Sequence, residues 1–242
     1  IIKGAAREPE IVSLSNFINK MGGDIKGAGT SIIEIDGKKR LFPSNYEVIG
    51  DRIEAATYIL SVAMSGGDLF LKGISSQHLG EFMKILEMIG IDYTKIDKGL
   101  RVRVEKKVFN PVNIKTAPFP GFATDMQALI VPFLCSVNGL SFIEETIFEN
   151  RFSHIYELKK MNAKITGEGR KIVINGPCNL IGAEVEASDI RACAGLIIAG
   201  LGATGITKIH NLEHLYRGYD SLAEKLISLG ANISFRVKNP ED

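Results

Sequence analysis

Apolar and polar positions follow the same succession several times along this chain. At Asp51, Asp125 and Asp189 a polar start is followed by a long apolar run, a glycine turn and a strand-like segment. The three segments read GDRIEAATYILSVAMSGGDLFLKG, TDMQALIVPFLCSVNGLSFIEE and SDIRACAGLIIAGLGATGITKIHN. Similarity that recurs in this way indicates repeated structural units. The pattern therefore predicts three copies of one unit, each with an apolar helix near its start.

A second helix is expected in each copy, because apolar residues there mark one helical face. The expected ranges are 78–90, 150–162 and 217–230, and each ends on Gly or Asn, which favour the left-handed conformation at a helix end. Short strands follow in the first two copies, including 100–104 and 171–174. The predicted unit is β-α-β-α-β-β.

The helices of one unit differ in which of their faces are apolar. Ranges 55–63 and 192–201 are apolar on nearly all sides, as expected of enclosed helices. Range 100–105 alternates apolar and charged residues, so one face of its sheet should meet water. The predicted fold class is an inside-out α/β barrel with buried helices and solvent-facing sheets. Pro132 is the exception, since a proline inside a helix should bend or break it.

A partial copy precedes these units. It consists of a helix at 9–21 and strands near 24–26 and 31–35. Range 38–50 is turn-rich and is the expected boundary between two lobes. The chain starts at Ile1 in what reads as the middle of a strand, which is the start expected of a fragment.

Composition narrows the possible partners and compartments. The chain has 242 residues, 45% hydrophobic and 24% charged, which is typical of a globular protein. Lys and Arg number 29 against 28 Asp and Glu, so the bulk charge favours neither nucleic acid nor an anionic membrane as a partner. The apolar runs are shorter than the ~20 residues of a membrane span, and no signal peptide is expected.

Cysteines and histidines give no metal-ligand spacing. Three cysteines are an odd number without paired spacing, which suits packing roles in a reducing cytoplasm. The four histidines are expected at the surface or behind the site. These residues are Cys135, Cys178, Cys193, His78, His154, His210 and His214.

Charged residues stand at the predicted helix starts, and capping explains only some of them. Asp51 and Thr124 are each followed three residues later by Glu or Gln, as in a capping box. Ser188 is the expected cap of the third helix, with Asp189 as a second possibility. Arg191 stands where Glu or Gln is wanted, although a cation in the first turn opposes the helix dipole.

Arginines at equivalent places of the repeat indicate an anion site. Arg151 and Arg217 are also predicted at helix starts, where a bound phosphate or carboxylate would be favoured. The three arginines either converge on one cleft or are simply solvated. Asp125 and Asp189 occupy matching helix starts, which gives two carboxylates among three guanidiniums. A carboxylate close to an anionic substrate takes up a proton more readily, which suits acid–base chemistry.

Several segments together resemble UDP-N-acetylglucosamine enolpyruvyl transferase, also called UDP-N-acetylglucosamine 1-carboxyvinyltransferase. The resemblance implies two lobes, each an inside-out α/β barrel of three β-α-β-α-β-β units. It implies transfer of the enolpyruvyl group of phosphoenolpyruvate to the 3′-hydroxyl of UDP-N-acetylglucosamine with release of phosphate, the first committed step of peptidoglycan synthesis, without metal or organic cofactor. The segments, in order, are 5–12 (AAREPEIV), 116–118 (TAP), 124–128 (TDMQA), 148–152 (FENRF), 188–192 (SDIRA) and 217–219 (RGY).

The resemblance also implies roles for matching residues. Asp125 would contact the sugar and take the proton from its 3′-hydroxyl, and the backbone of Ile147 would contact UDP-N-acetylglucosamine. Arg151 and Arg191 would hold the carboxylate of phosphoenolpyruvate. Arg217 would close over it from the second lobe. A further role falls to Asp189, which would orient these groups.

One part of the family's pattern lies before the region that this chain covers. The family has a mobile loop with a cysteine that acts as general acid and is the target of fosfomycin, and an early Lys-Asn pair that binds substrate. Residues 1–50 would then be the tail of the first lobe and residues 51–242 most of the second. The missing first lobe is thus an expected partner, and the chain alone should not turn over.

Two alternatives remain open at this stage. The shikimate-pathway enolpyruvyl transferase shares the fold, although segments 150–152 and 217–219 favour the sugar-nucleotide enzyme. The other alternative is a non-catalytic binding or scaffold protein that retains the repeat, in which case the cysteine loop is absent from the protein itself.

Overall fold

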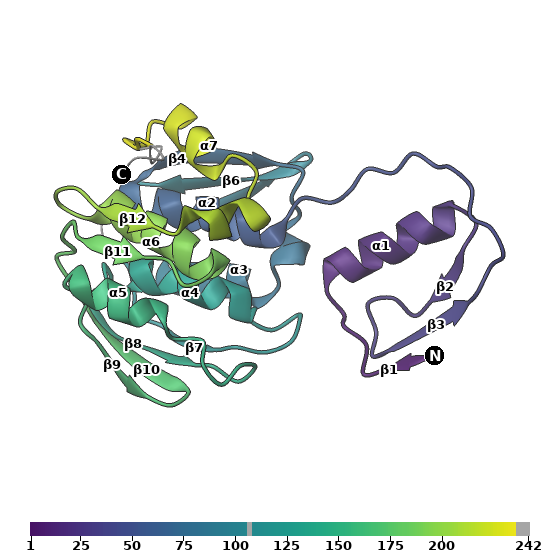
Figure 1. Ribbon diagram of the computed structural model, residues 1–242, viewed down its shortest axis with the longest axis horizontal. Helices are drawn as coiled ribbons and strands as arrows, with labels where there is room; N and C mark the ends of the chain where they lie inside the picture. The colour runs from purple at the N-terminus through teal and green to yellow at the C-terminus, as the bar shows by residue number, and fades with distance from the viewer. Residues whose placement is uncertain (106–107, 236–242) are drawn as a thin grey trace, which may run out of the picture.

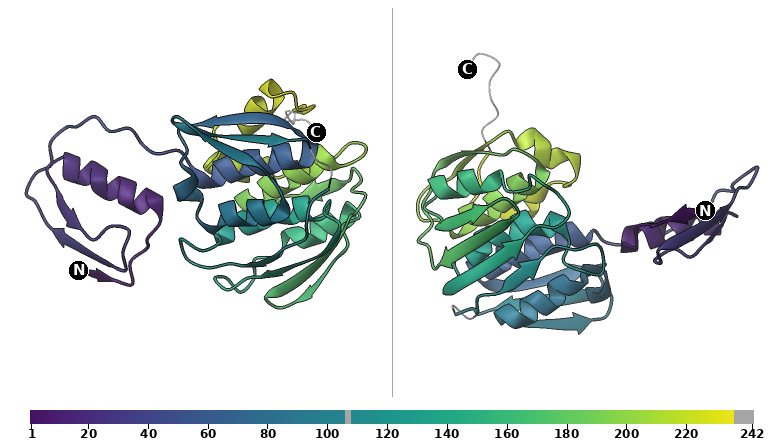
Figure 2. Two further views of the ribbon diagram at one scale, coloured as in Figure 1. Left: turned by 180° about the vertical axis from the view of Figure 1, so that it is seen from behind. Right: turned by 90° about the horizontal axis from the view of Figure 1, so that it is seen from below.

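The chain forms two bodies joined by an extended segment (Figure 1). The computed structural model describes residues 1–105 and 108–235. Figure 2 shows the same separation from two further directions. Residues 37–51 contain neither helix nor strand, in line with the turn-rich segment predicted at 38–50. None of the helices in the described ranges combines the length and apolarity that a membrane crossing requires.

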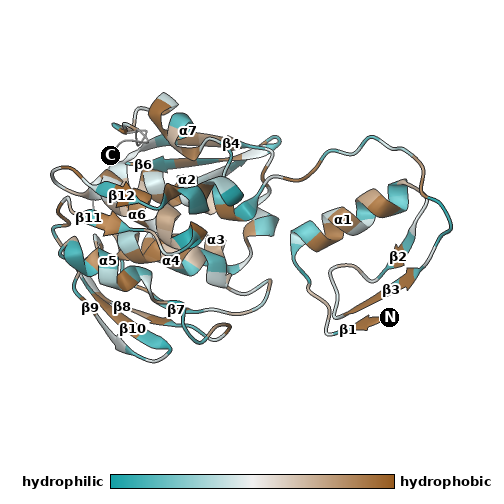
Figure 3. Cartoon of the chain, viewed as in Figure 1, coloured by the Kyte–Doolittle hydropathy of each residue, from teal (hydrophilic) through white to brown (hydrophobic). Residues whose placement is uncertain are grey.

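The smaller body has one helix beside a three-stranded antiparallel sheet. Helix α1 (Pro9–Lys20) begins with a proline, whose fixed φ suits the first helical turn. Its hydrophobic and hydrophilic residues alternate in bands, as expected of a helix with one packed face (Figure 3). The sheet order is β1-β3-β2, with β1 Ile2–Lys3, β2 Asp24–Lys26 and β3 Ile32–Asp36. This arrangement confirms the predicted partial copy.

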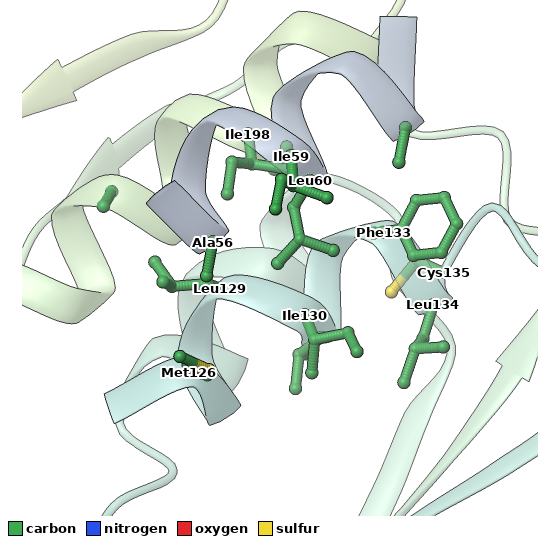
Figure 4. Close-up of a cluster of buried hydrophobic side chains, with 14 of the residues drawn as sticks. Ala56, Ile59, Leu60, Met126, Leu129, Ile130, Phe133, Leu134, Cys135 and Ile198 are labelled. Atoms are coloured by element: carbon green, nitrogen blue, oxygen red, sulfur yellow. The ribbon is translucent and has the colours of Figure 1, made fainter. Parts of the chain in front are cut away.

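Three buried helices form the centre of the larger body. They are α2 (Arg52–Ser65), α4 (Thr124–Leu134) and α6 (Ile190–Gly202), and each packs against the other two. Figure 4 shows apolar side chains from all three facing one another. The fully buried side chains include Ala56, Ile59, Leu129, Ile130 and Ile198. The prediction that the most apolar helices lie inside is therefore confirmed.

Sheets cover these helices and face the solvent. In strand β6 (Gly99–Val104), Leu100, Val102 and Val104 are buried, whereas Arg101 and Arg103 are exposed. This alternation confirms the predicted half-exposed sheet. The sheet orders are β4-β6-β5, β7-β8-β10-β9 and β11-β12. The remaining strands are β4 Gly67–Lys72, β5 Tyr93–Ile96, β7 Asn113–Lys115, β8 Gly139–Glu144, β9 Ile165–Glu168, β10 Lys171–Gly176, β11 Glu184–Glu186 and β12 Lys208–His210.

The second helices are shorter than predicted. Helix α3 (Glu81–Ile89) follows the 3₁₀ turn η1 (Ser76–Leu79), close to the predicted range 78–90. Helix α5 (His154–Lys160) begins four residues later than predicted, because side-chain and backbone hydrogen bonds hold the preceding loop. The predicted helix 217–230 corresponds to α7 (Leu222–Ser228), which begins five residues later than predicted because Ser221 takes a left-handed conformation. The 3₁₀ helix η2 (Leu212–Arg217) lies before it.

The β-α-β-α-β-β unit is complete in the second copy, from β7 to β10. Within residues 1–105 and 108–235, the first copy has no leading strand and the third has no final pair of strands, so these residues do not close a barrel. The fold class is that of the predicted unit rather than of a whole barrel.

Pro132 neither ends α4 nor interrupts its packing. The helix continues for two residues beyond it, to Leu134. Proline lacks the N–H that would bond to the carbonyl four residues earlier, so the carbonyl of Ala128 is freed. That oxygen faces Gly195 of α6, where an added Cβ would collide with it. Glycine at this position therefore lets α4 and α6 approach closely.

Two of the predicted helix caps have different partners. Asp51 caps α2 as predicted, because its carboxylate accepts hydrogen bonds from the N–H groups of Ile53 and Glu54. The Glu54 carboxylate does not bond back to Asp51, as a capping box requires, but accepts a hydrogen bond from Lys225 at 2.9 Å. The expected cap Thr124 is already inside α4, whose N-cap is Ala123 without a side-chain bond. The capping-box prediction for α4 is wrong because the Thr124 hydroxyl donates to a buried carboxylate instead.

Candidate functional site

The beginnings of α4 and α6 bring one carboxylate between two guanidiniums. Asp125 and Arg191 are each the second residue of their helix, and these helices lie side by side. The Arg191 Nη2 atom donates to Asp125 Oδ2 at 2.8 Å, and the Arg151 Nη2 atom donates to Asp125 Oδ1 at 2.5 Å. Three of the predicted site residues therefore form one contiguous cluster.

Asp189 fixes the start of α6. Its Oδ1 atom accepts the N–H groups of Arg191 at 2.8 Å and Ala192 at 3.0 Å. Burial opposes ionisation, but these amides, the Ser188 hydroxyl and the charge of Arg151 outweigh it and hold the pKa of Asp189 below its ordinary value. The prediction that Ser188 caps this helix is wrong, because the extended backbone of Asp189 places the longer carboxylate over the first amides.

Arg191 stays charged although its side chain is mostly buried. Burial alone would lower its pKa, but Asp125 and the Tyr219 phenol outweigh burial and raise it. Tyr219 in turn shares a 2.8 Å hydrogen bond with Thr57 of α2, and burial raises the pKa of its phenol. The sequence does not predict that Tyr219 and Thr57 support Arg191. Its one indication is that Tyr219 lies two residues after Arg217, in the segment 217–219.

Arg151 lies in the loop between β8 and α5, not at a helix start. Its guanidinium stacks over the Phe148 ring, with 4.8 Å between Cζ and the ring centroid. Such cation–π contacts hold a guanidinium in place without taking up its hydrogen-bond donors. Both residues lie in one loop, so helix or strand periodicity gives no signal for this contact.

Arg217 is not bonded to the cluster, although the two residues after it lie against the start of α6: Gly218 is next to Ile190, and Tyr219 interacts with Arg191. Arg217 is the exposed last residue of η2 rather than the first of a helix, and the residue after it is a glycine with an extended φ of −153°. Over the ranges 1–105 and 108–235, its side chain makes neither a hydrogen bond nor an ion pair. The structure therefore brings together two of the three predicted arginines.

The cluster lines two adjoining cavities. One has a volume of about 510 Å³ and is bounded by the loop 148–151 and residues 189–191. The other, of about 410 Å³, lies between α1 and the start of α2. Asp125 and Arg191 line both cavities, so they lie at the junction between the two bodies.

Ile147 lies next to the first cavity, in the loop that carries Arg151. Its side chain is exposed, and its backbone N–H donates to the carboxylate of Glu145 at 2.8 Å. Among the residues that the structure describes, no group donates a hydrogen bond to the carbonyl oxygen of Ile147.

Several other titratable side chains border the second cavity, among them Glu10, Asp51, Arg52 and His78. His154 is buried at the start of α5, close to Asp189 and Arg151, so of the two expected positions it takes the one behind the site. Burial lowers its pKa to about 4. Its Nε2 atom has no partner among the described residues. All three cysteines are free and buried. In the part of the chain that the structure describes, no three His, Cys, Asp or Glu side chains are grouped to hold a metal ion.

Comparison with known sequences identifies one family. Residues 1–226 match the family profile described as EPSP synthase (3-phosphoshikimate 1-carboxyvinyltransferase). A UDP-N-acetylglucosamine 1-carboxyvinyltransferase 1 of Halalkalibacterium halodurans is 47% identical over 242 residues, which are 100% of this chain and 55% of the relative. A protein of the same name from Caldanaerobacter subterraneus is 48% identical over 233 residues, or 96% of this chain and 56% of the relative. The chain thus spans about half the length of these relatives.

Solved structures confirm the fold class. The enolpyruvyl transferase NikO from Streptomyces tendae superposes with a TM-score of 0.86 at 25% identity, over 95% of this chain and 55% of that chain. EPSP synthase from Acinetobacter baumannii gives a TM-score of 0.75 at 21% identity, over 92% of this chain and 55% of the other. At this identity the similarity shows a shared fold and no more. The chain belongs to the EPSP synthase (3-phosphoshikimate 1-carboxyvinyltransferase) family of enolpyruvyl transferases.

Proposed function

We propose that this chain is the C-terminal part of an enzyme that transfers the enolpyruvyl group of phosphoenolpyruvate to the 3′-hydroxyl of UDP-N-acetylglucosamine. The observation that carries the proposal is the Asp125 carboxylate between the guanidiniums of Arg151 and Arg191 at the junction of the two bodies. The names of relatives 47% and 48% identical over nearly the whole chain support this choice of acceptor. The reaction belongs to peptidoglycan synthesis, and free cysteines suit its placement in the cytoplasm.

Arg151 and Arg191 bind the carboxylate of phosphoenolpyruvate. Planar guanidiniums match a carboxylate in geometry and charge, and both already reach a single carboxylate group. Because Asp189 fixes the first turn of α6, it orients Arg191 without touching the substrate. Arg217 closes over the anion from the second lobe, and its exposed place at the end of η2 leaves the side chain free to do so.

Asp125 acts as the general base. It takes the proton from the 3′-hydroxyl while that oxygen forms a bond to C2 of phosphoenolpyruvate and C3 takes up a proton from an acid. The bond between C2 and the phosphate oxygen then breaks while C3 loses a proton, which releases phosphate and restores the double bond. The acid and part of the substrate site come from the first lobe, to which we assign residues 1–50, with residues 51–242 in the second. The carbonyl of Ile147 binds UDP-N-acetylglucosamine.

The test is phosphate release by the full-length protein. We expect turnover with phosphoenolpyruvate and UDP-N-acetylglucosamine, none with shikimate 3-phosphate as acceptor, and none from residues 1–242 alone. Asp125→Asn should lower kcat at least ~100-fold, since general acid–base catalysis contributes about 10²–10⁴-fold. Asp97→Asn, at an exposed turn, is the matched control and should keep the wild-type rate.

Two results would reject parts of the proposal. Near-normal turnover by Asp125→Asn would rule out its role as the base. Turnover with shikimate 3-phosphate alone would rule out the sugar nucleotide as the acceptor.

A further inference from the structure

A buried carboxylate lies directly behind the site and has no part in the chemistry described above. Glu145 follows β8 and is 1% exposed. Inward positions of this strand are otherwise uncharged, as Ser141 and Ile143 show, whereas Glu144 points outward. Burying a carboxylate costs several kcal/mol unless hydrogen bonds compensate for the lost water. An acidic residue at this position therefore needs an explanation.

Four donors from three separate segments satisfy the Glu145 carboxylate. The Thr116 hydroxyl, which follows β7, donates to Oε1 at 2.9 Å. The N–H groups of Ile147 and Phe148 donate to the same oxygen at 2.8 and 3.2 Å. The hydroxyl of Thr124, the first residue of α4, donates to Oε2 at 2.9 Å. One side chain thus ties β7, α4 and the loop after β8 together.

Two of the three tied segments, α4 and the loop after β8, carry groups of the candidate site. Thr124 immediately precedes Asp125, and the loop contributes Ile147 and the Phe148 ring under Arg151. The loop is fixed a second time, because the Thr146 N–H donates to the Thr116 hydroxyl at 2.8 Å. Displacement of Glu145 would therefore move the loop and the start of α4 relative to each other.

The remaining anion ligand is fixed by different contacts. Arg191 depends on the Asp189 cap and on Asp125 and Tyr219. None of the Glu145 hydrogen bonds reaches these residues within the described ranges. Glu145 thus bonds to Ile147 itself and to Thr124 beside Asp125, whereas it reaches the other phosphoenolpyruvate ligand, Arg151, only through the Phe148 ring.

We propose that Glu145 is a positioning residue for UDP-N-acetylglucosamine: its carboxylate holds the Ile147 carbonyl and the Asp125 side chain in the relative arrangement that binds the sugar. This inference rests on the proposed function. It assigns no chemical step to Glu145, which acts only through the residues that it holds.

The test compares Glu145→Gln with Glu144→Gln in the full-length protein. A glutamine keeps one oxygen for the three donors at Oε1, and its NH₂ group can donate to the Thr124 hydroxyl, so the fold should persist. Hydrogen bonds to a neutral acceptor are weaker than those to a carboxylate. We expect the KM for UDP-N-acetylglucosamine to rise about tenfold and the KM for phosphoenolpyruvate to change less than about twofold. The amide hydrogens of Ile147 and Phe148 should exchange with solvent about tenfold faster.

The control variant removes the same charge one residue earlier. Glu144 pairs with Lys115 and Lys171 on the outer face at 3.6 and 3.9 Å, so Glu144→Gln should leave both KM values and both amides unchanged. Equal rises of the two KM values in Glu145→Gln, or a lower melting temperature with unchanged KM values, would show a structural role only and overturn the proposal. A wild-type protein without phosphate release would instead overturn the proposed function, and amide exchange would still report whether Glu145 holds the loop.

Discussion

His154 is a buried imidazole at the start of α5, beside the site. Burial has the largest effect on its pKa and lowers it, the charge of Asp189 raises it, and the charge of Arg151 lowers it. Burial prevails, so the pKa falls to about 4 from an ordinary value of 6.5. The ring is therefore neutral at neutral pH, and its Nε2 atom has no partner among the described residues.

The lowered pKa of His154 predicts how the stability of the protein depends on pH. Between pH 6.5 and pH 4 the unfolded chain binds a proton at His154 and the folded chain does not, so the free energy of unfolding falls as the pH falls through this window. From pH 6.5 to pH 5 the loss should be about 2 kcal/mol. His154→Gln should remove that part of the slope, measured by urea unfolding at several pH values. His214→Gln, on the partly exposed η2, should retain it; an unchanged slope in His154→Gln would contradict the assignment.

Single residues were predictable where local chemistry decides their role. The Asp51 cap follows from residue type and position alone, and the structure has it. The roles of Thr124 and Ser188 were not predictable, because each hydroxyl has a partner far along the chain or a stronger acceptor beside it. Arg191 was recognised as a poor helix-start residue, but only the fold shows that Asp125, 66 residues earlier, is its partner.

At the scale of elements, the contact between α4 and α6 depends on a matched proline and glycine. Pro132 frees the Ala128 carbonyl, and Gly195 leaves room for it. A side chain on Gly195 would force the helices apart. This explains how a proline is accommodated in a helix that is buried on all sides.

Gly195→Ala should therefore destabilise the protein by about 1–3 kcal/mol, the usual cost of overpacking. Gly200→Ala in the same helix is the control. Its added Cβ would lie 3.5 Å from Thr207, an ordinary contact, so the higher helix propensity of alanine should stabilise the protein by ~0.5–1 kcal/mol. Both values can be measured by denaturant unfolding, and equal effects of the two changes would refute the close-contact explanation.

Most elements could be predicted from hydrophobic periodicity, but several ends could not. The predicted enclosure of α2 and α6 is observed because all-round apolarity leaves no face for water. The starts of α5 and α7 were wrong because loop residues there have tertiary partners or a left-handed backbone, which periodicity does not report.

At the scale of the whole molecule, an ion pair links the two bodies across the linker. Arg52 at the start of α2 donates from Nε and Nη2 to Glu10 of α1 at 3.2 and 3.0 Å, and it also lies over the Phe119 ring. Burial would raise the pKa of Glu10, but Arg52 outweighs it and lowers the pKa. The link closes one side of the cavity that Asp125 and Arg191 line. The turn-rich linker was predictable from sequence, whereas this pairing over 42 residues was not.

Loss of this link should loosen the linker. In Glu10→Gln we expect trypsin to cleave after Lys38, Lys39 or Arg40 about threefold faster, because an exposed ion pair contributes ~0.2–1 kcal/mol. Glu34→Gln, on the exposed part of β3, should not change the rate. Equal cleavage rates in both variants and the wild type would show that the ion pair does not restrain the two bodies.

The ion pairs of Asp125 have a further consequence for the order of events. Arg151 and Arg191 are each engaged with this carboxylate, so an anion that takes both guanidiniums displaces it. The same displacement removes the two hydrogen bonds that the carboxylate accepts from the guanidiniums. Anion binding and release of the Asp125 carboxylate would then be one exchange of partners, and the carboxylate would be open to a hydroxyl group only when the anion is in place.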